Sequence, residues 1–336
     1  MKKITILGST GSIGTQALEV CRKHSFDVIA MTAGNNIELF CKQVEEFKPR
    51  TIFANNREVL KEQFPHIQIM YPEEIACIKT DIVLNALAGE HSELTIKAAK
   101  SGNNIALANK EALVYNGEKV MKAVRENKVR ILPVDSEHSA IFQALQCGKA
   151  VRKIFLTASG GPFFGYTKKQ LEDVTLEDVL KHPTWKMGKK VTVDSSTLMN
   201  KGFEFVEAMY LFDLDPSQIE IVIHPESIVH SAVEFADGSV IAQMSSPDMR
   251  LPIQYALAYP RRLESDVKPL SLIDLGKLTF FKPDFNTFTP LKCMLRAVET
   301  RKIPQIAALN DSLVEQFLKK EIRYIDIFNE LEEKFG

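Results

Sequence analysis

Apolar residues occur in short runs over the first 147 residues, separated by stretches in which apolar positions recur with helical spacing. The runs predict strands at Ile4–Leu7, Val28–Thr32, Thr51–Ala54, Asp81–Leu87, Asn104–Ala108 and Val129–Val134. The helical patterns between them include Ile37–Phe47, Glu93–Ala99 and Gly117–Asn127. Alternation at this spacing is typical of βαβ units, which form a parallel sheet covered by helices on both faces. The pattern therefore predicts an α/β domain with a doubly wound parallel sheet.

The pattern changes after Gly148. A strand is predicted at Lys153–Thr157, a helix from near Ser196 to Phe212, a strand at Ile219–Ile223, and a hairpin that turns at Asp237-Gly238. This mixture indicates an α+β domain with an open sheet. Pro283 to Pro290 is typical of a linker, and the last 46 residues predict short charged helices. We expect three domains: residues 1–148, residues 149–285, and a short C-terminal helical domain at 286–336.

Composition narrows the class of protein. The 336 residues exceed one ordinary core, and 25% charged and 45% hydrophobic residues are typical of globular chains. A formal net charge of -1 gives no reason to expect a nucleic-acid or acidic-membrane partner. The apolar run after Lys3 ends at Gly8, too early for a signal peptide, and no apolar stretch approaches the roughly 18 residues of a membrane span. Five scattered cysteines indicate packing in a reducing compartment, so we expect a cytoplasmic enzyme.

A glycine motif follows the first predicted strand. Gly8, Gly11 and Gly14 stand between that strand and a helical pattern from Thr15, where glycines let the backbone approach a pyrophosphate at a helix N-terminus. The context favours a Rossmann-type dinucleotide site over a merely tight strand–helix turn. The second strand ends at Thr32-Ala33-Gly34-Asn35-Asn36 without an acid for a ribose 2′-hydroxyl, which favours NADP, although no basic residue stands there either.

Acidic residues follow the sixth predicted strand. Asp135 and Glu137 are two residues apart, so an extended backbone directs both carboxylates the same way. Hard oxygen ligands suit Mg²⁺ or Mn²⁺. The alternative is a pair of acids that merely stabilises the N-terminus of a helix before Ser139.

A second polar group lies on the helix that follows Ser195. Asn200, Lys201 and Glu204 share one face by their spacing of three and four residues. Glu204 is a candidate third metal carboxylate, with Lys201 and Asn200 binding substrate oxygens. The alternative is a solvated ion pair, which the apolar neighbours of these residues disfavour.

Two loops complete the candidate site. Ser159-Gly160-Gly161 follows a strand and is able to form an anion-binding nest. Residues 182–188 combine His182, Trp185, Met187 and Gly188 without regular periodicity, which indicates a flap that closes over ligand. The alternative is a loop tethered by a buried tryptophan.

With these motifs in order, the chain resembles the 1-deoxy-D-xylulose 5-phosphate reductoisomerase family. The resemblance covers roughly residues 1 to 285 and is carried by GSTGSIG, LANKEALV, LPVDSEHSAIFQ, TASGGPF, HPTWKMGKKVTVDSSTLMNKGFE, HPESIVHS and SSPDMRLPI. It implies an NADPH- and divalent-metal-dependent rearrangement and reduction of 1-deoxy-D-xylulose 5-phosphate to 2-C-methyl-D-erythritol 4-phosphate in non-mevalonate isoprenoid biosynthesis. It also implies a homodimer.

The resemblance assigns roles residue by residue. The residues implied to bind NADPH are Thr10, Gly11, Ser12, Ile13, Gly34, Asn35, Asn36, Asn109, Glu111 and Gly188. Those implied to hold Mg²⁺ or Mn²⁺ are Asp135, Glu137 and Glu204. Those implied to contact substrate are Lys110, Ser136, Glu137, Ser159, His182, Ser195, Asn200, Lys201 and Glu204, of which Glu137, His182, Lys201 and Glu204 are implied to be catalytic.

Three positions depart from the family pattern. Asn35 stands where the family often has a basic residue, Glu226 replaces a frequent neutral residue, and Asp311 follows Asn310 where the family typically has AANE. We expect the C-terminal bundle to be trimmed by one or two helices. Two rival interpretations remain: another Rossmann enzyme, such as a semialdehyde or polyol dehydrogenase, and a non-catalytic NADP-binding regulator.

Overall fold

A computed structural model describes residues 1–181 and 188–336, and two compact units account for them. The first combines residues 1–139 with residues 248–267, and the second combines residues 140–247 with residues 268–336. The first unit is therefore built from two separate stretches of chain. The three-domain division predicted from the sequence stays a prediction.

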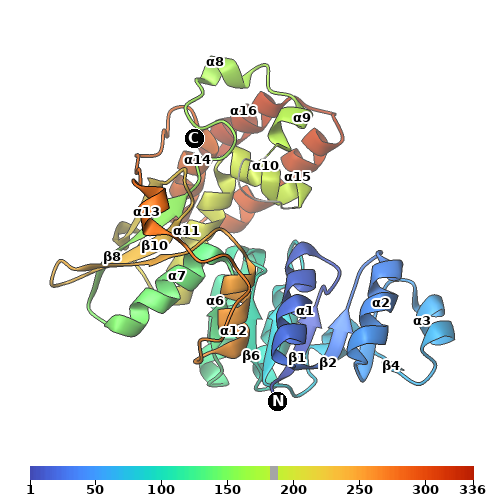
Figure 1. The fold of residues 1–336 in the computed structure, drawn as a ribbon. Coiled ribbons are helices and arrows are strands. Elements are labelled where there is room, and N and C mark those ends of the chain that lie inside the picture. Colours follow the sequence, from blue (N-terminus) through green and yellow to red (C-terminus); the bar gives the residue numbers. More distant parts are fainter. Residues whose placement is uncertain (182–187) are drawn as a thin grey trace. The chain divides into compact units, whose positions relative to one another are not determined.

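The first unit contains the predicted parallel sheet (Figure 1). Its seven strands lie in the order β4-β3-β2-β1-β5-β6-β7 and every neighbouring pair is parallel. In chain order they are β1 (Lys3–Leu7), β2 (Asp27–Thr32), β3 (Thr51–Phe53), β4 (Gln68–Ile69), β5 (Ile82–Asn85), β6 (Asn104–Leu107) and β7 (Ile131–Pro133). The chain leaves β1 toward β2 and later returns to its other side at β5, which makes β1 the switch point where ligands collect. The doubly wound α/β prediction is confirmed. Only β4 was missed, because two residues give no periodicity.

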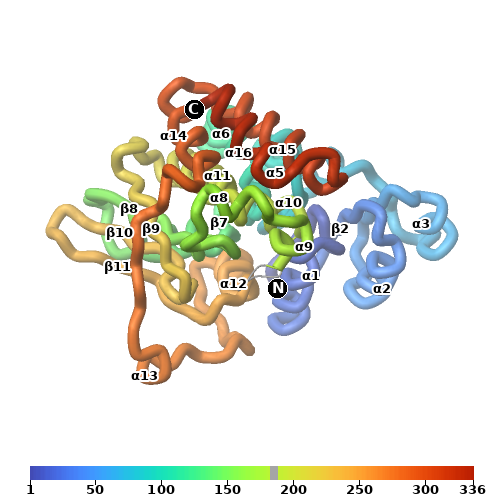
Figure 2. Tube along the Cα trace, turned by 90° about the horizontal axis from the view of Figure 1, so that it is seen from above, coloured from blue at the N-terminus to red at the C-terminus, as the bar shows by residue number. Residues whose placement is uncertain are grey.

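Helices cover this sheet and join its strands. They are α1 (Ser12–His24), α2 (Ile37–Phe47), α3 (Arg57–Gln63), α4 (Pro72–Ile75), α5 (Ser92–Lys100), α6 (Glu111–Glu126) and α12 (Arg250–Ala258). The last returns from far along the chain to lie beside α1 (Figures 1 and 2). Lys2 Nζ fastens the end of α12 by donating to the carbonyls of Leu257 at 3.0 Å and Tyr259 at 2.8 Å.

The second unit has the predicted open sheet, in the order β11-β10-β8-β9. Its strands are β8 (Val151–Ala158), β9 (Ile219–Ile223), β10 (Val229–Phe235) and β11 (Val240–Met244), with β8 and β9 parallel and the other pairs antiparallel. The hairpin turns where predicted: Gly238 has φ +84°, and Asp237 Oδ1 accepts the Ser239 amide at 2.9 Å. The α+β prediction is confirmed.

The helices that accompany this sheet form the remaining core. They are α8 (Lys168–Leu171), α9 (Leu176–Val179), α10 (Lys189–Ser196), α11 (Met199–Phe212), α13 (Leu272–Leu275), α14 (Thr289–Glu299), α15 (Ile303–Leu318) and α16 (Tyr324–Phe335), while α7 (Ser136–Ala144) runs across the division between the units. α11 and α14 pack closely at Gly202, where a Cβ would lie 2.8 Å from Met294 Cγ. The absence of a side chain at Gly202 allows this approach. The last helices are longer than the short helices predicted, since α14 has 11 residues and α15 has 16, and Pro290 belongs to α14 instead of a linker. Among the described residues no helix has the length and apolarity to cross a bilayer.

Candidate functional site

The turn between β1 and α1 has a shape that only glycine allows. Gly8 has φ +90°, and its amide donates to the carbonyl and hydroxyl oxygens of Thr32 at 3.1 and 3.0 Å, which ties the turn to the end of β2. A Cβ at Gly14 would lie 2.2 Å from the Gly8 carbonyl oxygen, so no larger residue fits. Gly11 is the N-cap residue of α1 and has no side chain to accept hydrogen bonds from the first-turn amides. These amides therefore face the turn, as a phosphate site requires.

Gln43, which was not predicted from the sequence, supports this turn through hydrogen bonds with Ser9. Ser9 Oγ donates to Gln43 Oε1 at 2.7 Å, and Gln43 Nε2 donates to the Ser9 carbonyl at 3.0 Å. Both side chains are buried. Gln43 lies on α2, and only its position among apolar residues of that helix distinguishes it in the sequence.

The predicted cofactor residues that follow β2 and β6 lie at the same edge of the sheet. Asn36 caps α2 through Oδ1, which accepts the Leu39 amide at 3.3 Å, and open space surrounds the position of a Cβ at Gly34. Asn109 follows β6, and its Nδ2 donates to the carbonyls of Leu87 and Gly89 at 3.0 and 2.7 Å.

Asn109 Oδ1 has an unusual environment. It is buried, yet no described residue donates a hydrogen bond to it. A buried acceptor without a donor is costly, so this atom suits a ligand N–H. Glu111, at the start of α6, accepts a hydrogen bond from Asn109 Nδ2 at 3.2 Å through Oε2. Gly188 belongs to the second unit, where it is the N-cap of α10.

The acids after β7 lie beside a lysine from α6. Lys110 Nζ is 2.5 Å from Asp135 Oδ2, and the two side chains are 13% and 12% exposed. Burial raises the pKa of Asp135, but the Lys110 ammonium, His138 and hydrogen bonds outweigh it and hold that pKa well below its usual range. Ser136 Oγ donates to Glu137 Oε2 at 2.5 Å. The first unit thus brings Lys110, Asp135, Ser136 and Glu137 together.

Two members of the polar group on α11, Lys201 and Glu204, are buried, and Asn200 is half-buried. Asn200 Nδ2 donates to Glu204 Oε1, while Lys201 Nζ pairs with Glu204 Oε2. Lys201 is 4% exposed and Glu204 is 2% exposed, which excludes a solvated surface ion pair. Apolar residues on both sides, Met199 and Phe203, account for this burial.

The glycine turn after β8 meets the C-terminal end of α10. Ser159 Oγ accepts the Gly161 amide at 3.2 Å, and Gly161 has φ +71°. A Cβ at Gly161 would lie 2.7 Å from the Ser195 carbonyl oxygen, so this glycine allows the turn to touch the helix. The second unit therefore brings together the backbone next to Ser159 and that of Ser195.

A partly buried network that sequence reasoning did not find holds α10 in place. Asp194 accepts from Asn310 Nδ2 at 2.8 Å and from Lys190 Nζ at 2.7 Å, and Lys190 also lies 3.0 Å from Asp311 Oδ1. The only sequence signal was a polar Asn310 in the apolar helix α15. This network fixes the helix that carries Ser195.

All of the predicted flap except Gly188 lies outside the described residues, and this part includes His182, Trp185 and Met187. The interpretations of these residues stay predictions.

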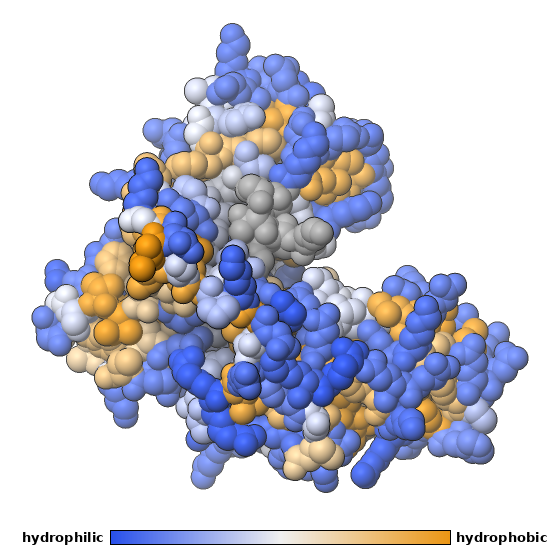
Figure 3. Space-filling view, in the orientation of Figure 1, coloured by the Kyte–Doolittle hydropathy of each residue, from blue (hydrophilic) through white to orange (hydrophobic). Residues whose placement is uncertain are grey.

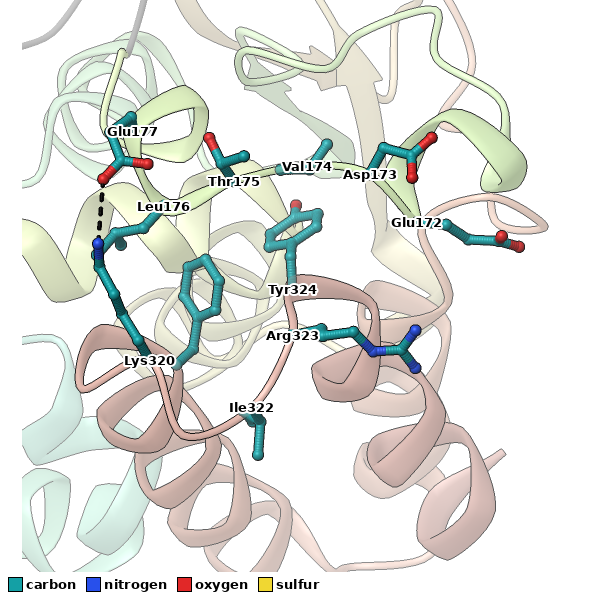
Figure 4. A pocket seen from close by; sticks show the side chains of 11 residues that line it. Glu172, Asp173, Val174, Thr175, Leu176, Glu177, Lys320, Ile322, Arg323 and Tyr324 are labelled. Carbon is teal, nitrogen blue, oxygen red and sulfur yellow. Dashed lines mark hydrogen bonds and ion pairs between the residues drawn. The ribbon is translucent and has the colours of Figure 1, made fainter.

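A pocket of about 310 Å³ in the second unit has no predicted site residue in its lining. Figure 4 shows Glu177 and Lys320 reaching toward each other across it, and their charges pair at 3.3 Å. Arg323, which also lines it, pairs with Asp326 at 2.8 Å. Because its cations are already neutralised, we assign no ligand to this pocket.

The first unit has a glycine turn at the switch point of a parallel sheet, which is typical of dinucleotide binding. The second unit holds buried carboxylate, ammonium and amide groups, which are typical of a catalytic site. Together they define a dinucleotide-binding enzyme. Three family models match the chain: 1-deoxy-D-xylulose 5-phosphate reductoisomerase over residues 4–117, the C-terminal domain of that enzyme over residues 131–212, and a further DXP reductoisomerase C-terminal domain over residues 244–335. The chain belongs to the 1-deoxy-D-xylulose 5-phosphate reductoisomerase family.

Individual members of the family are similar to this chain over nearly its whole length. The reductoisomerases of Caldanaerobacter subterraneus subsp. tengcongensis and Clostridium tetani are each 48% identical over 99% of this chain, and 91% and 92% of their own lengths are covered. A crystal structure of DOX-P reductoisomerase with NADPH, fosmidomycin and magnesium is similar with a TM-score of 0.94 at 37% identity, covering 99% of this chain and 88% of that one. The Zymomonas mobilis enzyme with NADPH has a TM-score of 0.91 at 34% identity, covering 99% of this chain and 91% of that one.

Proposed function

We propose that the protein converts 1-deoxy-D-xylulose 5-phosphate to 2-C-methyl-D-erythritol 4-phosphate, using NADPH and a divalent metal, in non-mevalonate isoprenoid biosynthesis. The observation that carries the proposal is the buried Lys201–Glu204 pair with its half-buried neighbour Asn200, in a chain that also has a dinucleotide cradle. Hydride transfer to a simple aldehyde needs a proton donor at one oxygen, whereas a rearrangement of a phosphorylated hydroxyketone requires charge and orientation at several oxygens.

The residues present fit NADPH. The Gly8–Gly14 turn leaves the first-turn amides of α1 without a side-chain cap, as a pyrophosphate site requires, and Asn109 Oδ1 offers a buried acceptor to a ligand N–H. Related enzymes were crystallised with NADPH. We therefore assign the cofactor to Thr10, Gly11, Ser12, Ile13, Gly34, Asn35, Asn36, Asn109, Glu111 and Gly188.

The carboxylates also fit a hard divalent metal. Asp135, Glu137 and Glu204 offer only oxygen ligands, which suit Mg²⁺ and Mn²⁺, and a related enzyme was crystallised with magnesium. We propose that these three residues hold one ion. When bound, the metal supplies Lewis-acid polarisation of substrate oxygens, and NADPH supplies the hydride that reduces the rearranged aldehyde.

The chain's own groups then bind and orient the substrate. The Lys110 and Lys201 ammonium groups and the Asn200 amide are donors for substrate oxygens, with Ser136, Ser159, Ser195 and His182 as further contacts. Glu137 and Glu204 position the reacting oxygens, and burial of Lys201 excludes the water that would weaken its charge. Closure of residues 182–188 over the ligand remains part of this proposal.

We also propose a homodimer in the cytoplasm. Exposed apolar side chains gather on the second unit around α13 (Figure 3). Ile273 is 92% exposed and Leu272 is 68% exposed, and a second copy of the chain is able to cover such a patch. All five cysteines are free thiols, which suits a reducing compartment.

Loss of NADPH absorbance tests the proposal against its rivals. We expect oxidation with 1-deoxy-D-xylulose 5-phosphate that stops when EDTA removes Mg²⁺ or Mn²⁺ and returns when the ion is restored. Oxidation with simple aldehydes but not with this substrate would favour a semialdehyde or polyol dehydrogenase. NADPH binding without turnover of either would favour a non-catalytic regulator.

A further inference from the structure

The turns that leave β2 and β3 form one surface at the edge of the sheet where the cofactor residues lie. The Ala33 amide donates to the Phe53 carbonyl at 2.8 Å, and the Asn55 amide donates to the Gly34 carbonyl at 3.2 Å. Asn55 Nδ2 also donates to Asn35 Oδ1 at 2.7 Å. A residue just after Asn55 therefore lies close in space to the end of β2, although 20 residues separate Asn35 and Asn55 in the chain.

Arg57 is the cation at this surface. Its Nη1 donates to the Tyr71 hydroxyl at 2.6 Å, and its guanidinium carbon lies 5.1 Å from the centroid of the Tyr71 ring. The ring of Tyr71 packs in turn against Phe53, with 5.7 Å between centroids. In the described part of the chain no carboxylate pairs with Arg57, so its charge is held in place and is not neutralised.

A cavity of about 490 Å³ lies at this surface. Its lining consists of Asn35, Ile37, Asn55, Asn56, Arg57 and Glu58. The lining offers one guanidinium, several side-chain amides and a single carboxylate, that of Glu58. The carboxylate opposes an anion, whereas Arg57 and the amides favour one.

In doubly wound folds the end of β2 meets the ribose of the adenosine, and an arginine near that point accommodates a 2′-phosphate. The end of β2 has neither an acid nor a basic residue in this chain, since Gly34, Asn35 and Asn36 stand there. We propose that Arg57, supplied by the β3–α3 turn and steadied by Tyr71, binds the 2′-phosphate and makes the protein specific for NADPH over NADH. The proposal rests on the proposed use of a nicotinamide dinucleotide.

The chemistry favours this assignment over a general role in cofactor binding. Guanidinium groups bind phosphate oxygens through two parallel N–H donors. The Tyr71 ring already restricts the guanidinium of Arg57, so little further conformational entropy is lost when a phosphate binds. NADH carries a hydroxyl at the same ribose position and gains nothing from the charge. Loss of Arg57 should therefore act on NADPH alone.

Equilibrium binding tests the proposal without turnover. The Kd values of NADPH and NADH are measured by dihydronicotinamide fluorescence, and those of 2′,5′-ADP and 5′-ADP by calorimetry, for the wild type, Arg57→Leu and Arg57→Lys. The matched control is Arg50→Leu, an exposed arginine that stands just before the amino end of β3. We expect Arg57→Leu to weaken NADPH and 2′,5′-ADP by about 10- to 100-fold, with NADH and 5′-ADP changed less than about twofold. Arg57→Lys should fall between, because it keeps the charge and loses the paired donors.

The outcomes separate this proposal from the function on which it rests. Wild-type binding of NADPH that Arg57→Leu leaves unchanged, or loss of NADH and NADPH affinity in equal measure, overturns the role of Arg57 alone. A wild-type preference for NADH also overturns it and assigns the ribose hydroxyl to Glu58. Failure of the wild type to bind either dinucleotide overturns both proposals. Tyr71→Phe gives a second, independent variant, and a weaker loss confined to NADPH supports the proposal.

Discussion

The Lys110 ammonium lies 2.5 Å from Asp135 Oδ2 in a setting where both side chains are mostly covered. Without a metal ion, Lys110 is the main positive charge that compensates the buried carboxylate. Lys110→Met should therefore lower the free energy of unfolding in EDTA by about 2–4 kcal/mol. Saturating Mg²⁺ should recover more stability in the variant than in the wild type, because a bound ion replaces the missing charge.

Denaturant titrations with and without Mg²⁺ measure this difference. The control is Lys97→Met, which removes an exposed ion pair with Glu93 in the same unit. Equal effects of Mg²⁺ on the wild type and on Lys110→Met would show that Asp135 does not bind the ion.

Two glycines of the proposed cofactor site should differ in what they lose on substitution. In Gly14→Ala the new methyl group would lie 2.2 Å from the Gly8 carbonyl oxygen, so we expect a loss of about 3 kcal/mol or more of stability. At Gly34 nothing lies within 4 Å of a Cβ, so Gly34→Ala should change stability by less than about 1 kcal/mol. Gly34→Ala should nevertheless weaken NADPH at least about tenfold, because the methyl group occupies the proposed cofactor position. Unchanged NADPH affinity in that variant would remove Gly34 from the site.

The prediction of the fold succeeded where pattern alone decides structure. Apart from the two-residue β4, each parallel strand of the first unit is a short apolar run between amphipathic stretches, and the glycine turn follows β1 as expected. The prediction missed α10, because Val191-Thr192-Val193 favours a strand by propensity. Contacts of Asp194 with Asn310, 116 residues away, contribute to the helix instead.

Only the part of the candidate site whose residues are close together in sequence was predicted. Chemistry-bearing residues close together in sequence, such as Asn200 and Glu204, were found by spacing. Supporting residues such as Gln43 and Asn310 were not, because their partners lie 34 and 116 residues away and only the folded chain brings them together.

His230 should make the second unit sensitive to acid. Burial lowers the pKa of His230 to about 4, a hydrogen bond with the Ser245 carbonyl opposes this, and His224 and Lys201 add to the lowering. Between about pH 6.5 and pH 4, His230 is protonated in the unfolded chain but stays neutral in the folded chain. The free energy of unfolding therefore falls as the pH falls through that window. The wild type should lose about 2–3 kcal/mol more than His230→Gln between about pH 7 and pH 4.

Urea midpoints at several pH values measure this loss. His66→Gln, at an exposed histidine of the first unit, should keep the pH dependence of the wild type. A His230→Gln variant that loses stability as steeply as the wild type would contradict the buried neutral state of His230.

Glu204 is proposed to be the metal ligand supplied by the second unit. Glu204→Gln keeps the size of the side chain and removes its charge, so turnover should fall by at least about a thousandfold while the NADPH Kd changes only a few fold. Mn²⁺ affinity, measured by calorimetry, should fall in parallel. Glu220→Gln, at an exposed acid that pairs with Lys153 at 2.5 Å, should leave both quantities unchanged. Metal-dependent activity that survives in Glu204→Gln would make the assignment wrong.

The identity of the product distinguishes a rearrangement followed by reduction from reduction alone. The wild-type protein is incubated with 1-deoxy-D-xylulose 5-phosphate, NADPH and Mg²⁺, and the product is identified by NMR while NADPH oxidation is followed. The account predicts one branched-chain 2-C-methyl-D-erythritol 4-phosphate for each NADPH oxidised, and neither product nor oxidation in EDTA. A reduced product with the original unbranched carbon skeleton, or oxidation that continues in EDTA, would contradict it.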